Sequence, residues 1–319
     1  MHAILMDERK EFCWSEVPDP VCRPGEVLIE IHAAALNRAD LLQRAGKYPP
    51  PPGWPEWMGL EVAGVIREAP PGSRWRPGDA VCALLGGGGY AEQVAAPEEL
   101  VLPIPKGLTM AEAASLPEAY ATAYLNLCIE AKMKAGETVL IQAGASGLGM
   151  AAIQLAKAFG ARVVTTVSTE EKKEAVLGLG ADIVVNRKTD DLGAVLDAHP
   201  VDIALDCVGG PGLGANIEKL ALGGRWILIA TLGGERAEIA LRPMLMRGLR
   251  LIGSTLRSRS NAMKGEILRA LEERLWPLLE SKRVRPTLYR TLPIAEAAEA
   301  HAILERGENI GKVVLKVRA

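Results

Sequence analysis

A glycine-rich turn between a short apolar strand and a helix constrains the fold of this chain more than any other feature. Residues 138–142 (TVLIQ) predict a buried strand, and the turn AGASGLG follows at residues 143–149. Residues 148–160 then carry apolar side chains at helical spacing, and residues 162–167 (RVVTTV) predict a second strand. Together they form one β-α-β unit, whose two strands run parallel.

Four more strand candidates follow this unit: residues 182–186, 201–208, 225–231 and 249–256. They are mostly apolar, as expected for strands of a parallel sheet that is covered on both faces. The segments between them hold either helices or short turns. Six strands in total predict an α/β fold with a doubly wound dinucleotide-binding domain over residues 120–256.

The chain before this domain is rich in short β-like runs and turn residues. The strands expected there are residues 26–36, 60–69, 79–85 and 90–96. We expect few helices and a compact, barrel-like β domain over residues 1–119. Residues 257–319 are too few for a third domain and are expected to complete the first. They comprise an amphipathic stretch at 261–282, a strand-like VRPTLYRTL at 284–292, a helix around 294–306 and a strand at 312–317.

Composition and charge exclude several classes of protein. With 49% hydrophobic and 24% charged residues, the chain is neither disordered nor fibrous. Its 37 Lys and Arg against 39 Asp and Glu give a net charge of −2, which argues against a strongly basic nucleic-acid binder. No apolar run approaches the roughly 18 residues of a membrane span, and we find no signal-peptide pattern. Five scattered cysteines favour a reducing compartment, so we expect a cytoplasmic protein.

The glycine turn itself suggests a phosphate site. Its spacing, G-x-x-G-x-G, differs from the common G-x-G-x-x-G fingerprint, but the physical reasoning is the same. Glycines let the backbone approach a ligand, and the N-terminus of the next helix offers free N–H groups to a pyrophosphate. Ser146 adds a hydroxyl donor. The alternative is a plain tight turn that binds nothing.

The residues after the second strand of the unit indicate which dinucleotide is bound. An enzyme that uses NAD places an acidic side chain near this strand end to bind the ribose hydroxyls. Here the strand-end residues are not acidic: Val167, Ser168 and Thr169. Cations follow that could receive a 2′-phosphate: Lys172, Lys173 and Arg187. The opposing evidence is Glu170 and Glu171, which could reach a ribose or simply begin a solvated helix. The pattern favours NADPH over NADH.

A basic stretch between residues 242 and 269 has three interpretations: a solvated surface, a patch for RNA, or contact with the cofactor. The solvated surface suits most of its cations. Arg257 is the exception, because it directly follows the sixth strand and is therefore expected near the cofactor.

Seven segments resemble a known family. They read AALNRADLLQRAGKYPPPPG (34–53), GLEVAGVI (59–66), LPEAYATAY (116–124), AGASGLGMAAIQLAK (143–157), LDCVGG (205–210), LRSRSN (256–261) and NIGKVVL (309–315). The chain resembles, over essentially its whole length, the zinc-independent quinone oxidoreductases of the zeta-crystallin type in the medium-chain dehydrogenase/reductase superfamily. This resemblance implies a GroES-like catalytic domain (1–119 with 257–319) and a Rossmann NADPH-binding domain with a six-stranded parallel sheet (120–256).

The zinc-containing branch of that superfamily does not match. Its members hold catalytic zinc with a Cys and a His, where this chain has Asn37 and Leu60. The four-cysteine loop of the structural zinc is also missing, since no Cys follows Cys82 in that region. Zinc needs thiolate, imidazole or carboxylate ligands in a tetrahedral arrangement, so we expect no metal.

The resemblance also implies site residues. Asn37 is expected to hydrogen-bond near the nicotinamide or the acceptor oxygen, and Tyr48 to donate its phenol hydrogen to the quinone carbonyl. The expected cofactor residues are Thr122, Ser146, Gly147, Leu148, Gly149, Ser168, Lys172, Arg187, Val208, Leu232, Gly233, Arg257, Asn309 and Lys312. Three simpler roles compete: Asn37 as a helix cap, Tyr48 packed on prolines, and Lys312 as a surface cation.

The expected activity is NADPH-dependent quinone reduction in an interdomain cleft, without metal. One alternative is an enal or enone reductase, because hydride delivery to a conjugated carbonyl can use the same site. Another is a non-enzymatic NADPH- or RNA-binding protein, although the near-neutral charge speaks against nucleic acid. The strand at 249–256 is expected to pair with its copy in a homodimer, as in the family.

Overall fold

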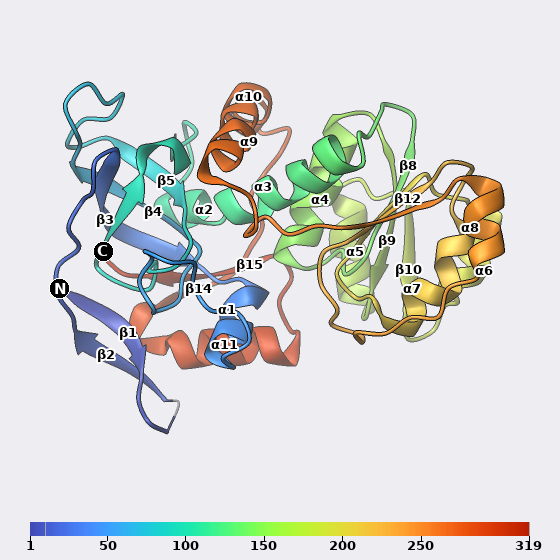
Figure 1. Cartoon of the computed structure of the whole chain (residues 1–319), viewed down its shortest axis with the longest axis horizontal. Helices are drawn as coiled ribbons and strands as arrows, with labels where there is room; N and C mark the ends of the chain where they lie inside the picture. Colours follow the sequence, from blue (N-terminus) through green and yellow to red (C-terminus); the bar gives the residue numbers. More distant parts are fainter. Residues whose placement is uncertain (10, 319) are drawn as a thin grey trace. The chain divides into compact units, whose positions relative to one another are not determined.

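The computed structural model describes residues 1–9 and 11–318, which fold as two compact units (Figure 1). Unit 1 comprises Met1–Ala121 with Arg259–Ala319, and unit 2 comprises Thr122–Ser258. Both boundaries lie two residues beyond those expected from the sequence, at 119/120 and 256/257.

The sheet of unit 2 has six strands, all parallel, in the order β10-β9-β8-β11-β12-β13. Counted within the unit, this is the order 3-2-1-4-5-6 of a Rossmann sheet. The strands are β8 (Thr138–Ile141), β9 (Arg162–Val167), β10 (Ile183–Asn186), β11 (Ile203–Asp206), β12 (Arg225–Leu228) and β13 (Arg250–Gly253). The predicted Rossmann domain with a six-stranded parallel sheet is therefore confirmed.

The helix predicted at residues 148–160 is α4 (Gly147–Ala158). Helices also fill the connections that the sequence left open: α5 (Glu170–Gly178), α6 (Leu192–Ala198), α7 (Gly210–Asn216), the short η3 (Ile217–Lys219) and α8 (Leu241–Arg247). A further helix, α3 (Pro117–Tyr124), continues into the π-helical η2 (Leu125–Glu130). One core cluster joins Leu140, Val164, Val185 and Trp226, side chains from four strands of this sheet. Their burial explains why these strands are apolar at almost every position.

The long strand β3 (Glu26–Ala35) organises unit 1. One edge pairs antiparallel with β4 (Glu61–Glu68). The other edge pairs with β6 (Gln93–Pro97) in its first half and with β15 (Lys312–Lys316) in its second half. The sheet also contains β5 (Ala80–Leu84), β7 (Val101–Pro103) and β14 (Leu288–Pro293). Because β3 serves three partners, the sheet curls into the barrel-like form of a GroES-like domain, as predicted.

Smaller elements complete unit 1. A hairpin of β1 (His2–Met6) and β2 (Phe12–Glu16) precedes the barrel and was not predicted. The helices are α1 (Arg38–Arg44), α2 (Met110–Ala114), α9 (Asn261–Arg274), α10 (Trp276–Glu280) and α11 (Ala297–Arg306), with short turns η1 (Glu98–Leu100) and η4 (Ile294–Glu296). The amphipathic stretch 261–282 is thus two helices, since Pro277 starts a new one.

Candidate functional site

The glycine turn of unit 2 is built on close backbone approaches. A Cβ on Gly144 would overlap the Thr165 hydroxyl, and one on Gly149 would lie 2.7 Å from the Gly144 Cα. Ala143 has a φ of +55°, a left-handed conformation that is uncommon outside glycine. The turn is therefore compressed between the end of β8 and β9, and two of its glycines are needed for that reason alone.

Helix α4 begins directly after this turn, with Ser146 as its N-cap. The Ser146 Oγ accepts a hydrogen bond of 3.0 Å from the Gly149 N–H. The N–H groups of Gly147 and Leu148 lie in the first turn, where no intrahelical acceptor is available. The expected pyrophosphate residues thus share one helix N-terminus, but the Gly149 N–H already has an acceptor. Among the described residues, no hydrogen bond is found for the N–H groups of Gly147 and Leu148 or from the Ser146 hydroxyl, so these are the donors available to a ligand.

Three cations gather beside the end of the second strand of this unit. Burial lowers the pKa of Lys172, a half-buried residue of α5, and the positive charges of Arg187 and Lys188 lower it further, while the Glu171 carboxylate acts in the opposite direction. Arg187 and Lys188 lie in the turn after β10, so cations from this turn and from α5 repel one another. The sequence analysis named Lys172 and Arg187 but missed Lys188, because nothing in the sequence shows which way that turn faces.

Glu170, one of the two acidic residues that could reach a ribose, already has partners in the protein. The Glu170 carboxylate accepts a hydrogen bond of 3.0 Å from the Asn186 side chain and lies 3.7 Å from the Lys173 ammonium. Glu170 therefore holds Asn186 at the end of β10, and Lys173 forms an ion pair with Glu170. Ser168 is half-buried at the end of β9, next to this group.

Hydrogen bonds connect the loops after β11 and β12 at the carboxyl ends of the strands. The Gly233 N–H donates to the Val208 carbonyl at 2.7 Å, and Leu232 N–H donates to Cys207 at 3.3 Å. The buried Asp206 carboxylate fixes the first loop, accepting from the Val208 N–H at 2.6 Å and from the Trp226 indole at 2.8 Å. Val208, Leu232 and Gly233, all expected at the cofactor, therefore lie together at the carboxyl ends of the strands, where open α/β sheets bind ligands.

The other expected residues of unit 2 lie at its ends. Thr122 is its first residue, and its carbonyl accepts a hydrogen bond of 2.7 Å from the Asn126 side chain. Arg257 lies in the turn that follows β13.

A buried polar cluster in unit 1 contains Asn37, Glu61 and Lys312. The Lys312 ammonium donates to the Leu36 carbonyl at 2.6 Å, to Asn37 Oδ1 at 2.8 Å and to Glu61 Oε1 at 2.5 Å. Asn37 Nδ2 donates to the same Glu61 oxygen at 2.9 Å. Lys312 is only 5% exposed, so its interpretation as a surface cation is wrong. The sequence analysis missed Glu61, which is fully buried in β4.

A second polar chain starts at the same asparagine. Asn37 is the N-cap residue of α1, and its N–H donates to the side chain of Asp40 in the first turn at 2.7 Å. The Tyr90 hydroxyl donates to the same Asp40 oxygen at 3.2 Å and lies 3.3 Å from His301 Nε2. Burial raises the pKa of Asp40 to about 6 and lowers that of His301 to about 3. Three titratable groups therefore form a buried chain behind Asn37.

Tyr48 and Asn309 are the other two residues of unit 1 that were expected at the site. Tyr48 is half-buried in the segment after α1. The Asn309 side chain donates to the Gly311 carbonyl at 2.8 Å and so shapes the turn that leads into Lys312.

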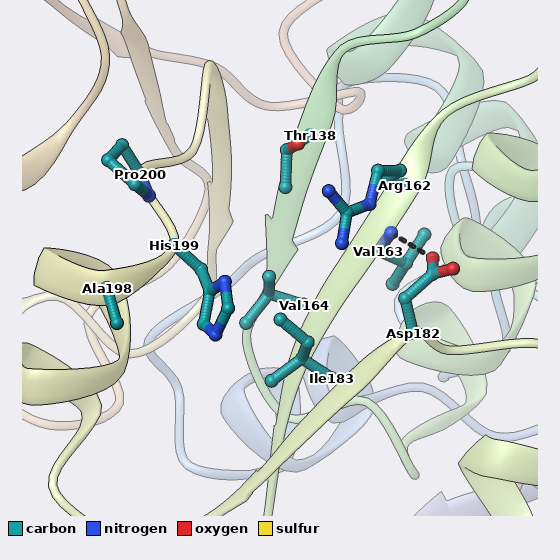
Figure 2. Close-up of a pocket in the computed structure, with 9 residues that line it drawn as sticks. All are labelled: Thr138, Arg162, Val163, Val164, Asp182, Ile183, Ala198, His199 and Pro200. Carbon is teal, nitrogen blue, oxygen red and sulfur yellow. Dashed lines mark hydrogen bonds between the residues drawn. The ribbon is translucent and has the colours of Figure 1, made fainter.

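A pocket in unit 2 lies at the amino ends of the strands (Figure 2). Its lining residues include Thr138, Arg162 and Ile183, the first residues of β8, β9 and β10. His199 and Pro200, just before β11, close it. Because it lies at the amino ends of the strands, this pocket is not the cofactor site.

Two family models match the chain. "Alcohol dehydrogenase GroES-like domain" covers residues 23–106, and "Zinc-binding dehydrogenase" covers residues 147–273. The chain is 31% identical to the rat (Rattus norvegicus) quinone oxidoreductase over 311 residues, 94% of this chain and 92% of that protein.

Solved structures of similar proteins match nearly the whole chain. The quinone oxidoreductase from Thermus thermophilus, solved also as its complex with NADPH, has a TM-score of 0.83 at 33% identity, covering 99% of this chain and 100% of that one. The JamJ enoyl reductase has a TM-score of 0.86 at 26% identity, with 99% of each chain covered.

Fold, site and comparisons together define an NAD(P)-dependent oxidoreductase of the medium-chain dehydrogenase/reductase superfamily. Within that superfamily, the chain belongs to the quinone oxidoreductases. The family suggested by the sequence is therefore confirmed.

A catalytic zinc, which one family description implies, does not fit the residues present. At the positions of the expected ligands, Asn37 offers an amide that already binds the Lys312 ammonium, and Leu60 offers no donor. Within residues 1–9 and 11–318, no three His, Cys, Asp or Glu side chains are arranged to hold a metal ion. No step below involves zinc.

Proposed function

We propose that this protein is an NADPH-dependent quinone oxidoreductase that works without a metal. The cation group of Lys172, Arg187 and Lys188 carries the proposal, because its mutual repulsion is relieved by a bound dianion. The 2′-phosphate of NADPH is such a dianion, and NADH lacks it.

Each group has a defined task in this proposal. The N–H groups of Gly147 and Leu148 and the Ser146 hydroxyl hold the pyrophosphate at the N-terminus of α4. Bound NADPH supplies the hydride for quinone reduction. Asn37 orients the nicotinamide or the acceptor, and the Tyr48 hydroxyl donates to the quinone carbonyl, where negative charge develops. The remaining contacts to NADPH come from Thr122, Gly149, Ser168, Val208, Leu232, Gly233, Arg257 and Asn309, whereas the expected contact from Lys312 is not part of the proposal, because its three donors are used on Leu36, Asn37 and Glu61.

The experiment that tests this function is NADPH oxidation by the purified protein, with NADH in parallel. Ortho-quinones, para-quinones and alkenals serve as acceptors. We expect fast quinone-dependent loss of NADPH and much slower loss of NADH. Tight NADPH binding without turnover of any acceptor would leave a nucleotide-binding protein and refute the enzyme.

A second candidate is an NADPH-dependent enal or enone reductase. The similarity to the JamJ enoyl reductase favours it, since that structure has a TM-score of 0.86 against 0.83 for the quinone oxidoreductase, at a lower identity of 26% against 33%. The same assay decides: good turnover of alkenals with poor turnover of quinones would select this second activity.

We also propose a cytoplasmic homodimer. All five cysteines are free, as expected in a reducing compartment. None of the described helices is long and apolar enough to cross a membrane. The outer edge of β13 and the neighbouring α8 expose apolar side chains, including Leu251, Leu241 and Leu245. An exposed edge strand with apolar neighbours is suited to pairing with its copy.

A further inference from the structure

The side-chain amide of Asn37 is held from both sides by opposite charges. Its oxygen accepts from the Lys312 ammonium at 2.8 Å, and its nitrogen donates to the Glu61 carboxylate at 2.9 Å. If the amide were flipped, its NH₂ group would face the ammonium and its oxygen would face the carboxylate. Only one orientation of this side chain is therefore compatible with its neighbours.

The charged pair that holds Asn37 is unusually well satisfied for a buried one. Lys312 uses its three donors on Leu36, Asn37 and Glu61. The second oxygen of Glu61 accepts a hydrogen bond of 2.9 Å from the Glu118 N–H, at the start of α3. The two side chains are 6% and 0% exposed. The pair thus connects β4, β15 and the start of α3 to Asn37, which lies two residues after the end of β3.

A buried ion pair is weak evidence for stability. Desolvation of both charges offsets much of their attraction, and well-packed apolar residues often replace such a pair without loss. Fixing the orientation of a neighbouring polar group is a role that apolar residues cannot perform. The pair at Asn37 has the geometry for that role, with a donor on one side and an acceptor on the other.

We propose that Glu61 and Lys312 are positioning residues, which fix the amide of Asn37 in the orientation that the reaction requires. This inference rests on the proposed function, in which Asn37 contacts the nicotinamide or the acceptor. Lys312 then acts through Asn37 and not as a direct cofactor ligand, because its three donors are already used within unit 1.

The test is a double-mutant cycle between Lys312→Met and Asn37→Ala, measured as kcat for quinone reduction. We expect each single variant to lower kcat about tenfold or more, with little change in the NADPH dissociation constant measured by fluorescence. Because Lys312 acts through Asn37, the double variant should be no slower than Asn37→Ala alone. Losses that multiply would overturn the inference, as would an unchanged kcat in Lys312→Met.

Two further variants separate positioning from folding. Lys312→Met leaves the buried Glu61 without its cation, so a folding defect is expected. The combined variant Glu61→Gln with Lys312→Met removes both charges, and we expect it to recover thermal stability without recovering kcat. Recovery of both would assign the pair to folding alone. The matched control is Arg225→Met, which breaks the largely buried Arg225–Glu137 pair (2.8 Å) at the start of β12 and should lower stability but not kcat.

A second readout does not need activity. In ¹⁵N-labelled protein, the Asn37 side-chain NH₂ signals are those absent from Asn37→Ala. We expect them to shift and to exchange with solvent faster in Lys312→Met and in Glu61→Gln, and unchanged signals would overturn the inference. If wild-type protein reduces no acceptor, the proposed function fails and these signals alone decide the orientation. If wild type is active but Asn37→Ala is equally fast, the inference fails and the proposed function stands.

Discussion

At the scale of single residues, the proposed preference for NADPH over NADH can be tested at Lys172. Lys172→Ala should raise the NADPH dissociation constant about tenfold and leave that of NADH nearly unchanged, since a charge-assisted contact to phosphate contributes roughly 1.5–3 kcal/mol. Lys173→Ala is the matched control, because Lys173 lies next to it in α5 but pairs with Glu170. Equal losses for both cofactors would remove the assignment of Lys172 to the 2′-phosphate. Fluorescence titration measures both constants.

Asp40 makes a prediction about pH. Burial raises its pKa from 3.8 to about 6, so the folded protein binds the proton more tightly than the unfolded chain. Its contribution to stability is therefore greatest below pH ~4 and is lost as pH rises to ~6, by about 3 kcal/mol. His301 acts in the opposite direction, because its pKa is lowered to about 3.

The comparison of wild type with Asp40→Asn isolates the carboxyl group. Thermal melts between pH 4 and pH 7 should show the variant gaining stability relative to wild type as pH rises. His301 and the other titrating groups largely cancel in this difference, although the Tyr90 hydroxyl links His301 to Asp40. A difference that does not vary with pH would mean that Asp40 is charged in the folded protein throughout.

At the scale of elements, the glycine turn can be tested with one methyl group. Gly149→Ala should weaken NADPH binding and lower Tm, because the new Cβ would lie 2.7 Å from the Gly144 Cα and overlap the Ala143 carbonyl. Gly178→Ala is the control, since nothing lies within 4 Å of its Cβ position in α5 and alanine favours a helix. If Gly149→Ala binds NADPH normally, the turn does not define the pyrophosphate site.

Periodicity explains which elements were predictable. The strands of unit 2 are apolar because both faces of their sheet are covered, and the apolar spacing of α4 is equally clear from the sequence. The hairpin of β1 and β2 was missed because charged residues interrupt it and its strands show no clean alternation. The end of α9 was missed because the amphipathic pattern continues beyond Pro277.

The residues of the candidate site also fall into those that a local sequence pattern can suggest and those that it cannot. Ser146, Gly147 and Lys172 could be proposed from the sequence because local order along the chain places them at a strand end or a helix start. Glu61 and Lys312 are 251 residues apart, and only the closing of the β3 sheet brings them together. No local pattern predicts that a lysine beside a strand is buried against a glutamate. Lys188 was missed because it depends on how one turn faces α5.

At the scale of the whole molecule, the exposed edge of unit 2 predicts the assembly. Leu251→Lys should convert a dimer into a monomer, because it places a charge at the centre of an apolar edge strand. Leu177→Lys is the control, an exposed leucine on α5. Light scattering coupled to size-exclusion chromatography measures both masses. Dimers in both variants would place the interface elsewhere.

The pairing of β3 with both β4 and β15 bears on how the protein is made. Residues 122–258 form unit 2 without interruption, whereas unit 1 needs strands from both sides of it. A nascent chain that has not yet reached residue 288 can close its nucleotide-binding unit while the first sheet is still open. During that interval Glu61 lacks Lys312, its partner in the folded protein. The contacts of Lys312 with Asn37 and Glu61 are therefore late steps in the folding of unit 1.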